Sequence, residues 1–303
     1  MIENSESPMS RPIVSVVIGS YNRIDFLKLT LESVRRELET VTAEIFVVDG
    51  GSDDGSLEWL AAQKDIVTIV QHNRGTWKGK PVRRRSWGYF MNLGFKSAQG
   101  KYVCMLSDDC LVVPGAIRNG IARAEAALAE GQPLGAVAFY WRNWPEQQRY
   151  WVGLTLRGRM FVNHGLYLRE ALATVGYVDE KTYAFYHADG DLCLKMWQAG
   201  FECIDSPDSF VEHYSHANEV VRESNLVTQK RDWERYLHKW QVLAPGADVT
   251  SGQGWLYRDF SDAAATADRF KRLAAVRAKG SGGALRKRIG RLRSAFGKRG
   301  SRV

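Results

Sequence analysis

Two adjacent carboxylates, Asp108 and Asp109, follow a short apolar run in the segment KYVCMLSDDCLVVP at residues 101–114. Like charges held side by side at the end of a buried strand repel each other unless a cation lies near them. Mg²⁺ and Mn²⁺ prefer oxygen ligands, commonly one or two carboxylates together with substrate phosphates. The pair therefore predicts a divalent-metal site, and the alternative is a solvated acidic turn.

This carboxylate pair follows one of a series of short apolar runs. The composition of buried β-strands is found at residues 13–18, 44–48, 66–70, 101–106 and 135–141. Helical patterns lie between and after these runs, at residues 91–98, 116–129, 169–175, 191–199 and 233–240. Alternating strands and helices predict an α/β fold with a mostly parallel, Rossmann-like sheet flanked by helices.

In open α/β sheets, ligands bind at the carboxyl ends of the strands, where the connecting loops meet. In this chain those ends carry Ser20 and Tyr21 after the first strand, Asp49 after the second, and the Asp108–Asp109 pair after the fourth. The loops contain neither GxGxxG nor GxxxxGKS/T, which argues against a dinucleotide oxidoreductase and a P-loop NTPase. The predicted site is an acidic and polar rim.

The charge of the chain is unevenly distributed. Its 303 residues hold 42 Lys and Arg against 34 Asp and Glu, a net charge of +8. Residues 269–303 contain 13 of the basic residues and no acidic residue, which leaves residues 1–268 with a net charge of −5. An acidic body argues against a uniformly basic nucleic-acid-binding domain, so no nucleic-acid partner is expected.

The basic tail has an amphipathic pattern. One apolar stripe would form on a helix from Leu285, Ile289, Leu292 and Phe296. The other faces carry Arg286, Lys287, Arg288, Arg291 and Arg293. This pattern is typical of a helix that lies in the plane of an anionic membrane surface. The alternatives are a disordered basic extension and a helix that packs on a partner.

Composition also bears on location. Apolar residues make up 45% of the chain, enough for a core, but no apolar run approaches the ~20 residues that span a bilayer. The polar start MIENSESPMS predicts no signal peptide. Four cysteines without CxxC spacing predict free thiols in a reducing compartment. We therefore expect a cytoplasmic protein, peripherally associated with the inner face of the cell membrane.

Five segments occur together in a family-like order and spacing. They are IVSVVIGSYNR, EIFVVDGGSDDGS, NRG at Asn73, NLGFKSAQGKYVCMLSDD and REALATVGYVDEKTYAFYHADGDLCLKMWQAGF. Together they resemble glycosyltransferase family 2 of the GT-A fold, of the kind that builds bacterial surface polysaccharides, over roughly residues 12–240. The resemblance implies inverting transfer of a sugar from a nucleotide-diphosphate sugar, with Mn²⁺ or Mg²⁺ as cofactor.

The resemblance implies nucleotide-binding roles for the first two strand ends. IGSYNR is similar to the family's PTYNR, so Ser20 and Tyr21 would line the base pocket, with Gly19 in place of Pro. Asp49 matches the first Asp of VVDDGS, whose carboxylate accepts from the uracil or thymine N3–H. A turn or cap role is the alternative for Asp49. The second Asp of that motif is Gly50 here, and a UDP- or dTDP-sugar is the expected donor.

The resemblance also implies the metal ligand and the base. LSDDC is similar to the family's metal motif, in which Asp109 aligns with the metal-binding Asp, and Asp108 would hold ribose or the metal. HADGDL is similar to the EDxDL segment, so Asp189 would be the general base that takes the proton of the acceptor hydroxyl. His187 beside it could share this role. Asp191 begins a predicted helix, as a site residue or as an N-cap.

Two histidines lie farther along the chain. EHYSHA carries His213 and His216, where several family members have a histidine near the metal. A neutral imidazole suits Mn²⁺, and the spacing does not choose between the two. The alternative for each is a core or surface histidine.

Two further segments could contact substrate. Residues 76–88 hold five basic residues and two tryptophans, which could bind a donor diphosphate or the pyrophosphate of a lipid-linked acceptor. A solvated basic loop is the alternative. Trp141, Trp144 and Trp151 cluster after the fifth strand. Aromatic faces pack on sugar C–H surfaces, so one of the three, with Trp144 as the candidate, is expected at the acceptor unless the cluster belongs to the core.

These observations predict an organisation and a function. We expect a flexible leader at residues 1–11, a GT-A domain at 12–243, a linker and helical extension at 244–279, and a basic amphipathic tail at 280–303. The predicted function is metal-dependent inverting glycosyl transfer to a glycan or lipid-linked saccharide. Because Gly50, Ser107 and Ala188 depart from the motifs, two alternatives stay open: a non-catalytic sugar-nucleotide or polysaccharide-binding module, and a membrane adaptor acting through the tail.

Overall fold

The computed structural model describes residues 11–243, 254–260 and 271. All of these except Lys271 belong to one compact unit that ends at Phe260. The predicted leader and the predicted membrane tail at 280–303 lie outside the described residues. Every helix of the described part is too short or too polar to cross a bilayer.

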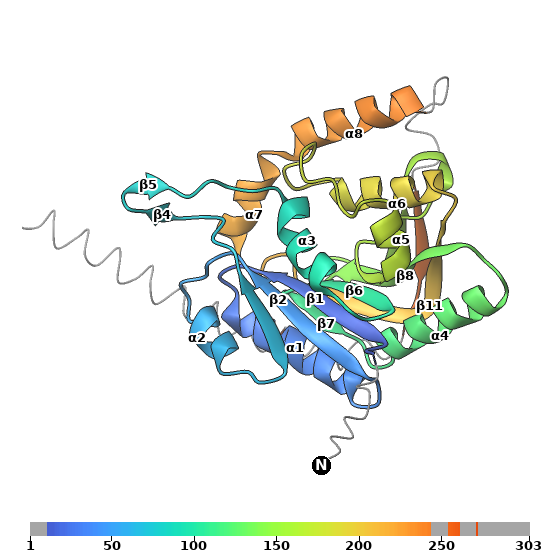
Figure 1. Ribbon diagram of the computed structural model, residues 1–303, viewed down its shortest axis with the longest axis horizontal. Coiled ribbons are helices and arrows are strands. Elements are labelled where there is room, and N and C mark those ends of the chain that lie inside the picture. The colour runs from blue at the N-terminus through green and yellow to red at the C-terminus, as the bar shows by residue number, and fades with distance from the viewer. Residues whose placement is uncertain (1–10, 244–253, 261–270, 272–303) are drawn as a thin grey trace, which may run out of the picture. The chain divides into compact units, whose positions relative to one another are not determined.

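A mixed sheet of ten strands forms the centre of the molecule (Figure 1). Its strands are β1 (Val14–Ser20), β2 (Ala43–Asp49), β3 (Ile66–Val70), β6 (Tyr102–Ser107), β7 (Cys110–Val112), β8 (Leu134–Asn143), β9 (Tyr150–Leu154), β10 (Gly165–Leu168), β11 (Glu202–His213) and β12 (Gly254–Arg258). The main order is β12-β9-β8-β10-β6-β1-β2-β3, and β11 pairs with both β7 and β8.

The first strands of the chain form the predicted parallel part of the sheet. β1 lies between β2 and β6 and is parallel to both, and β2 is parallel to β3. The core of β1 is fully buried, as its β-branched run predicts. Beyond β6 the sheet becomes mixed, because β10 is antiparallel to both β6 and β8.

Helices cover both faces of this sheet (Figure 1). They are α1 (Ile24–Leu38), α2 (Ser56–Ala61), α3 (Trp87–Ser97), α4 (Ala116–Ala129), α5 (Arg169–Thr174), α6 (Ala188–Gln198), α7 (Glu219–Leu226) and α8 (Gln229–Leu243). A 3₁₀ turn spans Leu156–Gly158, and a small hairpin of β4 (Thr76–Trp77) and β5 (Lys80–Pro81) projects from the body. α1 and α4 share a core with the strands, while Gly94 brings α3 onto Val17 of β1.

Three predictions need correction. β12 lies in the segment expected to be a linker and helical extension, and it pairs with β9, so the domain continues beyond residue 243. α6 begins at Ala188 rather than at 191, and His187 is its N-cap. β11 has no predicted counterpart, because its polar centre interrupts strand periodicity and its pairing with β8 shifts between Ser206 and Phe210.

Candidate functional site

The Asp108–Asp109 pair lies at the carboxyl end of β6, and both residues are buried. Arg23, which follows β1, reaches across the strand ends to both: its Nη1 is 2.6 Å from Asp108 Oδ1 and 3.0 Å from Asp109 Oδ2. Burial raises the pKa of Asp108 to about 6, although Arg23 opposes the increase. At Asp109, Arg23 and His213 outweigh burial and lower the pKa. A guanidinium therefore supplies the countercharge that the sequence assigned to a metal.

His213 at the end of β11 faces Asp109. Its Nδ1 is 2.7 Å from Asn143 Oδ1, and its Nε2 is 3.4 Å from Asp109 Oδ1. With Nδ1 donating to the amide oxygen, Nε2 and the carboxylate oxygen are two electron-rich atoms that face each other. Asp109 Oδ1 is buried and makes no hydrogen bond to the described residues. A proton or a cation between these two atoms would satisfy both.

These groups meet some, but not all, of the requirements of a divalent-metal site. Carboxylate oxygen and imidazole nitrogen are suitable donors for Mn²⁺, and the unsatisfied Asp109 Oδ1 offers a ligand. Within the described residues, however, no group of three or more His, Cys, Asp or Glu side chains is arranged as a metal site. Asp109 and His213 are the residues that would hold the ion, beside Arg23.

α1 supports the turn that carries the pair. Thr30 Oγ1 donates to the carbonyls of Asp108 and Cys110, at 3.0 and 2.7 Å. Two turns later, the buried Glu37 accepts from the amides of Gly115 and Ile117 at the start of α4. These contacts satisfy buried backbone groups that would otherwise be unpaired, so the turn has one conformation.

The nucleotide-binding residues predicted from the sequence lie at adjoining strand ends. Ser20, Tyr21 and Asp108 line a cavity of about 140 Å³ with Gly50. Gly50 has a physical reason here: a Cβ at this position would lie 3.0 Å from Cδ2 of the Tyr21 ring. The ring therefore packs where the second Asp of the family motif would stand. Asp49 is buried beneath, and burial raises its pKa.

The Asp49 carboxylate is engaged in its own turn. Oδ1 accepts from the amides of Gly51 and Ser52 at 2.8 and 2.7 Å, and Oδ2 accepts from Ser52 Oγ at 2.8 Å. These are the hydrogen bonds of an Asp that stabilises a turn, which is the alternative considered for Asp49. Binding of the base by Asp49 stays a prediction.

Arginines surround the same cavity, and none of them was assigned a role in it individually from the sequence. Arg74 Nη2 donates to Asn225 Oδ1 at 2.9 Å, and its guanidinium lies 5.2 Å from the centre of the Tyr21 ring. Arg84 also donates to Asn225 Oδ1. Burial lowers the pKa of Arg74 and of Arg84, but both stay charged at neutral pH. The cavity is therefore lined by cations suited to a diphosphate.

The basic loop at residues 76–88 has two parts with different surroundings. The β4–β5 hairpin carries an exposed Trp77, whereas Arg84 and Arg85 line the cavity with Tyr21. On their other side, Arg83, Arg84 and Arg85 line a second cavity of about 680 Å³ with Lys181, Arg231 and Arg235. The loop is thus more than a solvated basic segment at its C-terminal end.

Asp189 lies across a cavity of about 330 Å³ that Asp109, His213 and Trp141 also line. Its Oδ2 accepts from Asn163 Nδ2 at 2.9 Å, and its Oδ1 accepts from the amide of Gly190. The structure therefore brings the predicted base and the predicted metal carboxylate to one pocket. This cavity is called the reaction pocket below.

Asp232 of α8 fixes the loop in front of α6. This buried carboxylate accepts from the amides of Ala184, Phe185 and Tyr186 at 2.8–3.1 Å. The loop leads directly to His187 in left-handed conformation, with φ of 66°, where α6 begins. The position of the predicted base thus depends on a carboxylate from another helix.

Asp191 is neither the N-cap of α6, which is His187, nor one of the residues that line the reaction pocket. It is buried in the first turn of α6, and its Oδ1 accepts from Tyr183 Oη and Trp240 Nε1, both at 2.9 Å. Lys239 Nζ lies 2.7 Å from the same oxygen. Asp191 therefore joins α6 to α8 from behind the pocket.

Of the remaining candidate residues, some line the reaction pocket and others lie outside it. His187 lines the reaction pocket with Asp189, and burial lowers its pKa. His216 pairs with Glu146 at 2.5 Å on the surface, so His213 is the histidine at the carboxylates. Trp144 packs on Tyr214, with ring centres 5.6 Å apart, and does not line the reaction pocket. Trp141 is the member of that tryptophan cluster that does.

The family described as "Glycosyl transferase family 2" matches residues 15–168, half of the chain. The chain belongs to this family, and its described part is a glycosyltransferase domain, which confirms the predicted family. The matched region holds the Asp108–Asp109 pair and ends before Asp189.

Two named relatives illustrate the similarity. The succinoglycan biosynthesis protein ExoO of Rhizobium meliloti (strain 1021) is 32% identical over 122 residues, 39% of this chain and 32% of that protein. The chondroitin synthase of Escherichia coli is 30% identical over 105 residues, 33% of this chain and 14% of that protein. The chain thus spans about a third or less of the length of these relatives.

Solved structures share the fold. The mannosyltransferase PcManGT of Pyrobaculum calidifontis, solved with GDP-Man and Mn²⁺, has a TM-score of 0.53 at 20% identity, over 79% of this chain and 67% of its own. S. aureus TarS 1–349 has a TM-score of 0.52 at 15% identity, over 78% and 66%. These similarities confirm the predicted GT-A fold.

Proposed function

We propose that the protein is a metal-dependent inverting glycosyltransferase that uses a nucleotide-diphosphate sugar, with a UDP- or dTDP-sugar as the preferred donor. The single observation that carries the proposal is that Asp109 and Asp189 line the same pocket of about 330 Å³. In inverting transfer, the diphosphate leaves from one side of the sugar while the acceptor hydroxyl attacks from the other. In this pocket, Asp109 would act on the side of the diphosphate and Asp189 on the side of the hydroxyl.

In this proposal the donor lies along the strand ends. The nucleoside would contact Tyr21 and Ser20, and the diphosphate would be met by Arg74 and Arg84, which line the adjoining cavity. A bound divalent ion, held by Asp109 and His213, would supply Lewis-acid stabilisation of the leaving diphosphate. PcManGT, a fold neighbour, was solved with GDP-Man and Mn²⁺, which supports this class of donor and cofactor.

Asp189 would accept the proton of the acceptor hydroxyl. Its Oδ2 is oriented by Asn163, and Oδ1 by the Gly190 amide, so the carboxylate is held in one orientation toward the pocket. The acceptor would be a glycan or a lipid-linked saccharide. ExoO, a relative, is a succinoglycan biosynthesis protein, which supports a polysaccharide context.

The test is nucleoside diphosphate release from UDP-, dTDP- and GDP-sugars, with Mn²⁺, with Mg²⁺ and with EDTA. We expect release from one donor class only, dependent on the metal and lost in Asp109→Asn. Donor binding without turnover by the unaltered chain under every condition would instead support the non-catalytic binding module.

The membrane part of the proposal concerns residues 280–303. Deleting them should abolish binding to vesicles of anionic phospholipid while nucleoside diphosphate release is unchanged. Equal vesicle binding by both chains would contradict the peripheral membrane location.

A further inference from the structure

A second cleft opens from the reaction pocket on the side away from the arginines. It has a volume of about 650 Å³ and shares His187 and Asp189 with the reaction pocket. The two cavities therefore meet at the proposed base. A molecule in this cleft presents one end to Asp189, so the cleft is placed where an acceptor must enter.

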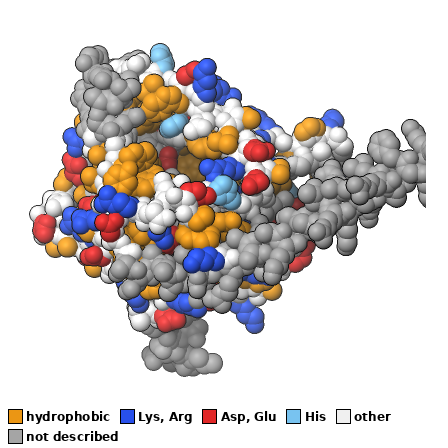
Figure 2. All heavy atoms as spheres, turned by 180° about the vertical axis from the view of Figure 1, so that it is seen from behind, with side chains coloured by type: hydrophobic (Ala, Val, Ile, Leu, Met, Phe, Trp, Pro, Cys, Tyr) orange, Lys and Arg blue, Asp and Glu red, His pale blue; other side chains and the backbone are white. Residues whose placement is uncertain are grey.

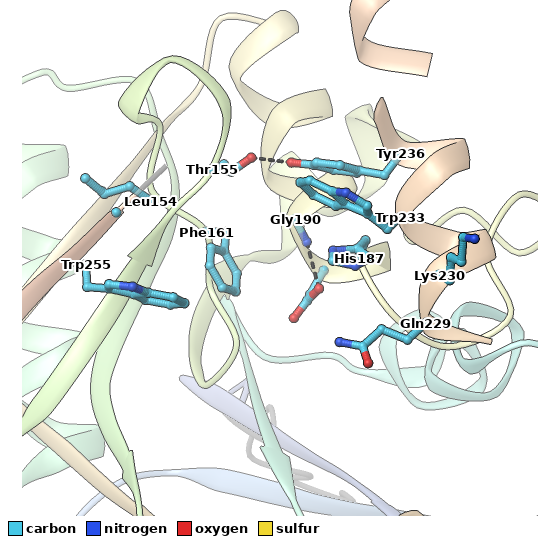
Figure 3. Close-up of a pocket in the computed structure, with 12 residues that line it drawn as sticks. Leu154, Thr155, Phe161, His187, Gly190, Gln229, Lys230, Trp233, Tyr236 and Trp255 are labelled. Carbon is cyan, nitrogen blue, oxygen red and sulfur yellow. Dashed lines mark hydrogen bonds between the residues drawn. The ribbon is translucent and has the colours of Figure 1, made fainter. Parts of the chain in front are cut away.

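Aromatic side chains form the walls of this cleft (Figure 3). Phe161 and Trp255 stand on one side and Trp233 on the other, with His187 between them (Figure 3). Seen from outside, hydrophobic side chains gather around a hollow with an acidic side chain at its bottom (Figure 2). Flat aromatic faces on both sides of a cleft suit a flat ligand with apolar faces.

The cleft is assembled from distant elements. Trp255 lies on β12, half exposed, with its ring 4.2 Å from that of Trp151. Trp233 lies on α8, with its ring 4.9 Å from that of His187. Phe161 packs over Gly153 of β9, where a Cβ would collide with its ring. Trp255 and Phe161 are thus supported by residues of the sheet, whereas Trp233 packs on His187 of the cleft itself.

The polar content of the cleft excludes a strongly charged ligand. Its lining includes Thr155, Gln229 and Lys230, and the Lys230 side chain is 91% exposed. The arginines line other cavities, so a pyrophosphate would find its partners there and not here. Thr155 Oγ1 is engaged by Tyr236 Oη and the Leu156 amide, but neutral hydroxyl groups can bond to Gln229 while C–H faces pack on the rings.

Resting on the proposed function, we infer that this cleft binds a neutral saccharide chain of at least two sugar residues as the acceptor, clamped between Trp255 and Trp233 with its terminal hydroxyl at Asp189. Its volume lies well inside the range of about 300–1,000 Å³ of small-molecule sites, which suits more than one ring. The lipid pyrophosphate of a lipid-linked acceptor is not what this cleft recognises.

The experiment uses the full chain and labelled neutral gluco-, galacto- and manno-oligosaccharides of one to six residues. Binding is followed by saturation-transfer NMR without donor, and the acceptor KM is measured in transfer assays. For the unaltered chain, affinity rises from one residue to two or three and then levels. Trp255→Ala and Trp233→Ala each weaken binding of the longer members about tenfold, the effect of losing one aromatic contact.

The matched control is Trp77→Ala, which removes an exposed tryptophan on the β4–β5 hairpin, outside the cleft, and leaves saccharide binding unchanged. Donor KM and donor hydrolysis stay the same in the Trp255→Ala and Trp77→Ala chains, which separates lost acceptor binding from misfolding. If the unaltered chain does not turn over any donor, the proposed function is wrong. The saturation-transfer NMR measurement of oligosaccharide binding still tests the cleft in that case.

Three outcomes overturn the inference. One is the absence of binding for every oligosaccharide. Another is binding that Trp255→Ala and Trp233→Ala leave unchanged. The third is a polyprenyl-pyrophosphate-linked sugar whose binding depends on Arg231 and Arg235 and not on either tryptophan, because this would place the acceptor in the arginine-lined cavity.

Discussion

The two sides of the reaction pocket are built by different means. On the donor side, the turns after the neighbouring strands β1 and β6 bring together Arg23, Asp108 and Asp109, and ion pairs hold them. On the acceptor side, Trp233 and Trp255 come from a late helix and the last described strand, and rings rather than charges form the walls. The family match, residues 15–168, includes Arg23, Asp108 and Asp109 and stops before Trp233 and Trp255. The charged cluster therefore lies in the part of the chain that matches the family, whereas the two tryptophans lie outside the matched residues.

The largest expected effect comes from Asp189, where the donor and acceptor sides meet. Asp189→Asn keeps the size and the bond to Asn163 but cannot accept a proton, so kcat falls about 10²–10⁴-fold. Product formation is measured with saturating donor and acceptor. Asp65→Asn, which changes an exposed carboxylate paired with Arg35, serves as the control and keeps full activity. A rate within about threefold of the unaltered chain would remove Asp189 from the role of base.

The next test addresses the charges of the donor side. Arg23→Met leaves two buried carboxylates without their countercharge, which lowers the free energy of unfolding by about 3–5 kcal/mol in urea titrations. Arg35→Met removes a surface pair instead and costs at most about 1 kcal/mol.

Metal addition sharpens this second test. If Mn²⁺ binds at Asp109 and His213, it stabilises the Arg23→Met chain more than the unaltered chain, because the ion then replaces the missing cation. Equal stabilisation of both chains, measured at the same Mn²⁺ concentration, would argue against a metal at these carboxylates.

The third test asks how the acceptor side positions the base. Asp232→Asn weakens the bonds to three consecutive backbone amides, and we expect a loss of about 1.5–3 kcal/mol in stability together with a lower kcat. Asp191→Asn is the matched variant, because Asp191 accepts from the side chains of Tyr183 and of Trp240 in α8 but from no amide of the 184–186 loop. Its stability should fall while kcat changes less. Equal effects on kcat would show that the loop bonds have no special role.

The smallest expected effect concerns the altered motif residue Gly50. Gly50→Asp restores the usual family residue, but its Cβ would lie 3.0 Å from the Tyr21 ring, which must shift. We expect a donor KM changed by a few-fold and an unchanged acceptor KM. Kinetics with both substrates varied measure the two values. A change confined to the acceptor would contradict the placement of Tyr21 on the donor side.

Much of the donor side could be predicted because its residues are close to strand ends along the chain. Asp109 and Asp189 were identified from short motifs, and the parallel strands from their β-branched runs. Arg23 lies within a recognised segment, yet nothing local indicates that its guanidinium crosses to β6. From the sequence, a metal was expected to neutralise the two carboxylates, but in the structure Arg23 neutralises them.

The acceptor side escaped prediction because it depends on contacts between distant segments. The helical spacing of Trp233 and Tyr236 indicated a buried face, but half of that face borders a cleft. Trp255 lies in a glycine-containing stretch that favours a linker, and only pairing with β9 makes it a strand. Asp232 has no motif at all, since its three amide partners are about 46–48 positions earlier in the chain.

The two carboxylates that fasten α8 have a consequence for how specificity can change. Asp232 and Asp191 are contacted from the buried side of the α8 junction, while Trp233 and Lys230 face the cleft from the same helix. If the cleft binds the acceptor as inferred above, substitutions at the cleft-facing positions would change which saccharide fits while the two carboxylates keep α8 in place. Grafting the cleft-facing residues of α8 from another family member would then be a direct route to a changed acceptor preference.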